Sequence, residues 1–196
     1  MKRKLLVWLL VSLVTWAGLA AGAFAKTYFE VAQGLLRNLP EDARLRDDLE
    51  AVIFAEANRY RSSKGIASLS ASDKLQDAAR AQAIDMMLNG FVGHQATTGQ
   101  QFETRMRAFV GNTMFMPRMA ENAARDTQRG EANAAKARRL FQQWVGSKPH
   151  RKALLNGTYT FVSTGVVQRG NKIWAVQIFF APLPDDNKIT GSGGLY

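Results

Sequence analysis

The sequence predicts an α+β domain in which helices pack on an antiparallel sheet. From residue 27 to residue 145, apolar residues recur at spacings of three and four, which is typical of amphipathic helices. Near the C-terminus, two runs of strand-forming residues (161–167 and 173–180) flank a turn at 169–172, which predicts a central β-hairpin. With 196 residues, 46% of them apolar and 21% charged, the chain has the composition of a single globular domain.

The first 25 residues have the pattern of a secretory signal peptide. Basic residues 2–4 precede an apolar run from Leu5 to about Ala21, and residues 23–25 read Ala-Phe-Ala, a small-x-small cleavage signal. The segment 5–25 contains no charge and is also long enough to span a bilayer, so an uncleaved anchor stays open. Either leader implies an extracytoplasmic protein, periplasmic or secreted, with membrane contact only through an uncleaved leader.

Two helices are expected before residue 62. The segment 27–38 is a short helix candidate. Pro40, followed by Glu41 and Asp42, suits the first turn of a second helix, because acidic side chains stabilise the positive end of the helix dipole. Apolar residues at helical spacing continue this helix to Tyr60.

Three further helices are expected from local signals. Ser70 and Asp73 have the spacing of a capping box at the start of one helix, and Gly90 is its expected terminator. A shorter helix ends at Gly111, and an alanine-rich helix covers 131–145. Methionines on these helices are predicted to fill the core.

The remaining segments complete the domain organisation. Residues 114–120 are predicted to form a short strand, and Pro117 within it places this strand near a sheet edge or a bulge. The C-terminal segment is too polar and glycine-rich to be core. The chain is therefore divided into a leader (1–25), an N-terminal helical extension (26–44), the main domain (45–182) and a flexible tail (183–196).

Basic residues are concentrated in one part of the chain. The formal net charge is +10, and residues 100–152 contain 11 basic and 4 acidic residues. Such an excess favours anionic lipid headgroups, acidic wall polymers or nucleic acid, and export disfavours nucleic acid. A solvated basic face without a ligand is the alternative. The chain has no cysteine, so the exported domain relies on packing without disulfides.

Both histidines of the chain lie in one window, with a carboxylate between them. His94, Glu121 and His150 are side chains that can hold a metal ion or share protons. Arg105 is expected to be the structural ion-pair partner of an acidic residue. Trp144 is expected in the core, as is the tryptophan of the hairpin.

Several short signals follow one another in a specific order between Leu49 and Phe180. They are Asn58-Arg59, Gly90-Phe91-Val92-Gly93-His94, Ala120-Glu121-Asn122-Ala123, Trp144 with Ser147, Pro149-His150-Arg151 and Thr164-Gly165-Val166. In this order they resemble the CAP superfamily (cysteine-rich secretory proteins, antigen 5 and pathogenesis-related 1 proteins), and within it the cysteine-free bacterial SCP-like branch. The resemblance implies a three-layer α-β-α sandwich, with a small antiparallel sheet and a shallow cleft.

The resemblance also implies a cleft site. In many eukaryotic members the cleft holds two His and two Glu that can bind a divalent metal such as zinc. Here His94 and Glu121 match the first His and the first Glu, Ser147 stands in place of the second Glu, and the second His is absent. His150 belongs to a motif of bacterial members. The implied cleft residues are thus His94, Glu121, Asn122, Ser147 and His150, and a zinc site would need His94, Glu121 and His150 together.

Three functions are compatible with these residues. The favoured one is a non-catalytic binding module whose cleft and basic rim take an anionic or amphipathic envelope ligand, such as a lipid, a wall polymer or a peptide. The second is a metal-assisted or general-base hydrolase centred on Glu121 and His94. The third is a structural role in envelope assembly. Ser147 lacks the Gly-x-Ser-x-Gly context of a hydrolase nucleophile, which disfavours a serine hydrolase.

Overall fold

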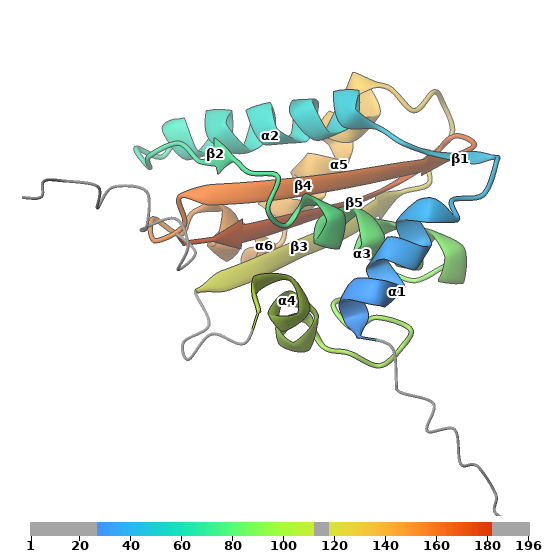
Figure 1. Cartoon of the computed structure of the whole chain (residues 1–196). Helices are drawn as coiled ribbons and strands as arrows, with labels where there is room; N and C mark the ends of the chain where they lie inside the picture. The colour runs from blue at the N-terminus through green and yellow to red at the C-terminus, as the bar shows by residue number, and fades with distance from the viewer. Residues whose placement is uncertain (1–26, 112–117, 182–196) are drawn as a thin grey trace, which may run out of the picture.

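A computed structural model describes residues 27–111 and 118–181, in which a sheet lies between two layers of helices (Figure 1). The strands follow the order β1-β4-β5-β3, and β2 pairs with β4 beyond the end of β1. Their bounds are β1 Ala43–Leu45, β2 Ser70–Ala71, β3 Met119–Asp126, β4 Phe161–Arg169 and β5 Lys172–Phe180. All pairs are antiparallel except β2 with β4. The predicted α+β class and three-layer architecture are confirmed.

The helices divide between the two faces of the sheet. Their bounds are α1 Tyr28–Arg37, α2 Asp47–Ser62, α3 Gln76–Asn89, α4 Phe102–Val110, α5 Ala134–Gly146 and α6 Lys148–Leu154. Helices α2, α5 and α6 bury a core that includes Trp144, Val162 and Phe179, whereas α3 and α4 bury a second core that includes Trp174 and Val176. Alternation along β4 and β5 explains this division, because successive side chains point to opposite faces. Both tryptophans are in the core, as predicted.

The predicted hairpin is confirmed as the centre of the sheet. Gly170 adopts a positive φ of 59° in the turn between β4 and β5, a conformation that glycine enters without steric cost. On β4, Gly165 lies directly under α3, and a Cβ there would be 2.3 Å from the main-chain nitrogen of Arg80. Only glycine therefore allows this close approach of helix and sheet. The predicted helix end at Gly90 is confirmed as well, with φ 72°.

Two predicted helix starts are wrong, because short edge strands occupy those segments. The helix expected from Pro40 begins only at Asp47. Pro40 instead begins a turn, in which its carbonyl accepts from Ala43 N, and residues 43–45 form β1, in which Arg44 pairs with Gln168. The capping box expected at Ser70 does not form, since Ser70 lies in β2 and its N–H donates to Thr160 O. In both places, hydrogen bonds to β4, far away in the sequence, stabilise a short strand instead of the helix that the local sequence indicates.

Two further differences affect the site. The strand predicted at 114–120 begins at Met119 and continues to Asp126, at the edge of the sheet, while 112–117 lie outside the described residues. Helix α6 was not predicted, and it follows α5 directly, with Pro149 in its first turn. None of the described helices is long and apolar enough to cross a membrane. The leader and the tail also lie outside the described residues, so their assignments stay predictions.

Candidate functional site

Strand β3 places the two polar residues of the predicted cleft on opposite faces of the sheet. Glu121 pairs with Ile178 and faces the α3/α4 layer, whereas the next residue, Asn122, pairs with Gln177 and faces the α5/α6 layer. Because β3 is an edge strand, side chains from both layers meet around it. The site therefore wraps around the sheet edge, which the sequence did not predict.

Glu121 is held from two directions. Nη2 of Arg105, on α4, lies 2.9 Å from both carboxylate oxygens, and Nδ1 of His94 lies 2.9 Å from Oε1. The Arg105 and Glu121 side chains are 0% and 1% exposed, but that of His94 is 50% exposed. The expected role of Arg105 as a structural ion-pair partner is thus confirmed, with Glu121 as its partner.

Two aromatic rings hold Arg105 in place. Its guanidinium carbon lies 5.5 Å from the ring centroid of Tyr28 and 5.6 Å from that of Phe102, within cation–π range. Burial raises the pKa of Tyr28 to about 12, against the opposing effect of Arg105, so the phenol is neutral at physiological pH. Tyr28 belongs to α1, so the N-terminal helix supports the site, a contribution that sequence reasoning missed.

His150 approaches the same edge from α6. The Asn122 Nδ2 donates to the His150 carbonyl at 3.2 Å, and the rings of His94 and His150 have centroids 6.5 Å apart. Burial, and secondarily the charge of His94, lower the pKa of His150, so its ring is neutral at pH 7. His94 thus contacts Glu121, and its ring lies near that of His150, so the three residues lie around one sheet edge.

Ser147 is not joined to this group by a hydrogen bond. It lies at the junction of α5 and α6, where its N–H donates to Gln143 O and its carbonyl accepts from Arg151 N. Within the described residues, its hydroxyl makes no hydrogen bond to the other predicted cleft residues. Its observed contribution is to the backbone between the two helices.

The arrangement does not form a metal cage. Within residues 27–111 and 118–181, no group of three or more His, Asp or Glu side chains is placed to hold a metal ion. The physical reason is that Arg105 and His94 already occupy the oxygens of Glu121. The residues as placed do not fit zinc, and the zinc site stays a prediction.

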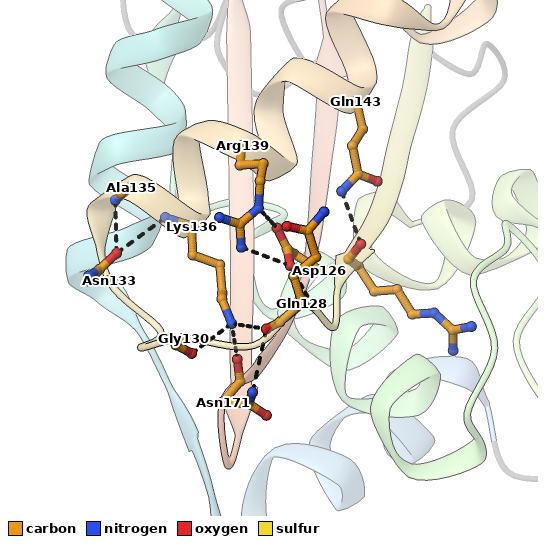
Figure 2. A network of polar contacts seen from close by, with 10 residues as sticks. Asp126, Gln128, Gly130, Asn133, Ala135, Lys136, Arg139, Gln143 and Asn171 are labelled. Atoms are coloured by element: carbon orange, nitrogen blue, oxygen red, sulfur yellow. Dashed lines mark hydrogen bonds and ion pairs between the residues drawn. The ribbon is translucent and has the colours of Figure 1, made fainter.

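Many of the basic side chains between 100 and 152 are already used inside the protein. Ion pairs join Arg107 to Glu103, Arg138 to Glu56 and Arg139 to Asp126. Lys136 is 1% exposed and its ammonium donates to the carbonyls of Gln128, Gly130 and Asn171, as Figure 2 shows. These groups make contacts within the fold, and each of the three arginines is paired with a carboxylate.

The basic residues of α6 differ from these. Lys148, Arg151 and Lys152 make no ion pair with any described residue. The guanidinium of Arg151 donates to Val145 O. Together with Pro149 and Leu155 they line an open pocket of about 460 Å³ whose walls are mostly apolar. The basic cluster was visible in the sequence, but without α6 the pocket could not be predicted.

Comparisons with known proteins agree with this architecture. The sequence model of the cysteine-rich secretory protein family, CAP, matches residues 54–179. The protein YkwD of Bacillus subtilis (strain 168) is 29% identical over 129 residues, 65% of this chain and 46% of YkwD. The chain thus spans about half the length of this curated relative.

Two solved structures share the fold. An outer surface protein from Borrelia burgdorferi superposes with a TM-score of 0.59 at 18% identity, over 71% of this chain and 98% of that one. An extracellular protein from Bacillus anthracis that contains an SCP domain superposes with a TM-score of 0.52 at 24% identity, over 66% and 39% of the two chains. These structural neighbours are outer-surface or extracellular proteins.

Proposed function

Because the chain belongs to the cysteine-rich secretory protein (CAP) family, we propose that it is an exported, non-catalytic binding module for an anionic, amphipathic ligand of the cell envelope. The observation that carries this proposal is the α6 pocket, where apolar walls are combined with the cations Lys148, Arg151 and Lys152. A buried acyl chain gains free energy by leaving water, and a phosphate group gains from nearby ammonium and guanidinium groups. Such a pocket suits a phospholipid or a lipid-linked wall polymer.

Export is proposed from two independent observations. Residues 1–25 have the pattern of a signal peptide, either cleaved after Ala25 or kept as an anchor. The structural neighbours named above come from outer-surface and extracellular locations. The ligand is therefore sought among envelope components.

A hydrolase centred on Glu121 and His94 is supported less well. A general base must have a free lone pair directed at water or substrate. The carboxylate of Glu121 is 1% exposed and accepts from Arg105 and His94. The carboxylate on which that mechanism depends is therefore already engaged by Arg105 and His94.

Vesicle binding tests the proposal. The purified protein is sedimented with vesicles of phosphatidylglycerol and, separately, of phosphatidylcholine. We expect binding to the anionic vesicles alone, and a loss of about tenfold or more in the double variant Lys148→Glu/Lys152→Glu, since each basic group near an anionic surface contributes about 1 kcal/mol. The control, Lys64→Glu/Lys172→Glu, makes the same change in net charge at two exposed positions outside α6.

Equal losses in both double variants would show a general effect of net charge and would contradict a site on α6. Equal binding to both kinds of vesicle would contradict recognition of an anionic ligand. Circular dichroism of all variants confirms that they are folded before binding is compared.

A further inference from the structure

The outer edge of β4 is covered at both ends but not in its middle. Near one end, Val162 O accepts from Ser72 N at 3.0 Å, just after β2. Near the other, Val166 O accepts from Arg46 N at 2.9 Å, just after β1, and Val166 N donates to Glu50 Oε1 at 3.0 Å. Main-chain groups of alternate residues point to the same side of a strand. The N–H and C=O of Thr164 therefore face this uncovered stretch.

Among the described residues, no hydrogen bond from a loop, a turn or a side chain reaches these two groups of Thr164, although the residue is only 7% exposed. Buried main-chain groups without a partner are rare, because each costs free energy comparable to a lost hydrogen bond. They are normally satisfied by protein, water or a ligand. The gap in the sheet edge thus presents one donor and one acceptor in the arrangement that an added strand would use.

An open pocket of about 430 Å³ lies at this gap. Helix α2 contributes Ala51 and Phe54 to its wall, and Thr164 forms its floor on β4. The remaining lining residues come from α2, from the segment after β2 and from α3; they include Asp47, Glu50, Ser72, Asp73, Gln76 and Arg80. Figure 1 shows β2 between α2 and β4 at this edge of the sheet. The volume is that of a small-ligand site.

The charge of this pocket is opposite to that of the α6 pocket. Three carboxylates face one guanidinium, that of Arg80. Glu50 is fully engaged, since it accepts from Gln76, from Arg80 and from the N–H of Val166. Asp47 shares Arg80 but its side chain is 81% exposed, and Asp73 forms no ion pair with a described residue. The three carboxylates of the lining exceed its single guanidinium by two negative charges, and this excess attracts a cation.

We propose that this pocket binds a short extended peptide segment that carries a cationic side chain, lysine or arginine. One peptide residue pairs with the N–H and C=O of Thr164 and locally extends the sheet. Its side chain lays its aliphatic stem against Ala51 and Phe54 and places its charge between Asp47 and Asp73. The site lies at the β4 edge, opposite the β3 edge that α6 contacts, so it is independent of the ligand proposed for α6.

The test is a titration of the isotope-labelled full chain, followed by amide NMR, with the probe acetyl-Ala-Lys-Ala-amide. We expect saturable shifts centred on Thr164 and its neighbours in the pocket. Replacing the lysine of the probe by glutamate, or methylating its lysine main-chain nitrogen, is expected to abolish them. The variant Asp47→Asn/Asp73→Asn should bind about fivefold more weakly, since it removes both carboxylates that pair with the lysine of the probe.

The matched control is Glu41→Gln/Asp48→Asn, which removes two carboxylates close in sequence but outside the pocket. It is expected to bind the probe like the wild type. The proposal is overturned if the lysine probe fails to saturate, if the glutamate probe shifts the same amides, or if both double variants lose affinity equally. Shifts that saturate but map away from Thr164 would overturn it as well. Thermal unfolding of each variant separates a loss of binding from a loss of fold.

Discussion

Removing Arg105 should destabilise the protein far more than its single ion pair suggests. The Arg105→Met variant replaces the guanidinium side chain by an apolar one of similar length. Glu121 then stays buried, with His94 as its only remaining side-chain partner among the described residues. Breaking one half of a buried ion pair costs about 3–5 kcal/mol, because the remaining charge has no compensation. Domains of this kind have a free energy of unfolding of about 5–15 kcal/mol, so a large part of the total would be lost.

A double-mutant cycle measured by urea unfolding isolates the pair. Glu121→Gln in the Arg105→Met background removes the uncompensated charge and keeps a hydrogen-bond acceptor for His94. We therefore expect the double variant to be more stable than Arg105→Met alone, with a coupling free energy of about 2–3 kcal/mol. A loss below about 1 kcal/mol in Arg105→Met, or additive effects in the cycle, would refute a buried Arg105–Glu121 pair as the support of the cleft.

Four further outcomes are expected. Gly165→Ala should lower the free energy of unfolding by about 3 kcal/mol or prevent folding, because its Cβ would lie 2.3 Å from the main chain of Arg80; wild-type stability in urea would contradict this close approach. Lys136→Met should lower the free energy of unfolding, measured in urea, by about 2 kcal/mol, because three carbonyls lose their hydrogen-bond donor. An unchanged free energy of unfolding would mean that water replaces the ammonium. The lowered pKa of His150 means that the folded state favours the neutral ring, so its contribution to stability is present above the unfolded pKa of about 6.5 and is lost as the pH falls toward the folded value. His150→Gln should therefore show a smaller decline of stability with acid, and an identical decline would count against a half-buried neutral ring. Zinc should leave the melting temperature unchanged, because the oxygens of Glu121 are engaged, whereas a rise that disappears in His94→Ala would establish the metal site predicted from the sequence.

Long elements with strong periodicity could be predicted from the sequence, and short ones could not. The hairpin and the helix that ends at Gly90 follow from local patterns that the fold preserves. Strands β1 and β2 contain three and two residues, too few for a periodic signal. They form only because β4 offers hydrogen bonds from a distant part of the chain, where Ala43 pairs with Arg169 and Ser70 with Phe161. The local signals at Pro40 and Ser70 were therefore overridden by tertiary pairing.

The candidate site could be predicted only in part, because it too depends on contacts between distant parts of the chain. The family resemblance implied that His94, Glu121 and His150 are cleft residues, and the residue type of Arg105 predicted its ion-pair role. The identity of its partner depends on how α4 packs against β3, which no local pattern specifies. Likewise, Asn122 was expected beside Glu121 in one cleft, but strand alternation turns it to the other face.

Whether α6 carries the ligand site can be measured by locating an anionic amphiphile bound to the protein. Short-chain phosphatidylglycerol, kept below its micelle concentration, is titrated into the isotope-labelled protein and the amide signals are followed. We expect saturable shifts concentrated on α6, from Lys148 to Leu155, and no shifts with the zwitterionic phosphatidylcholine analogue. Shifts that are absent, or that fall on another surface, would contradict it.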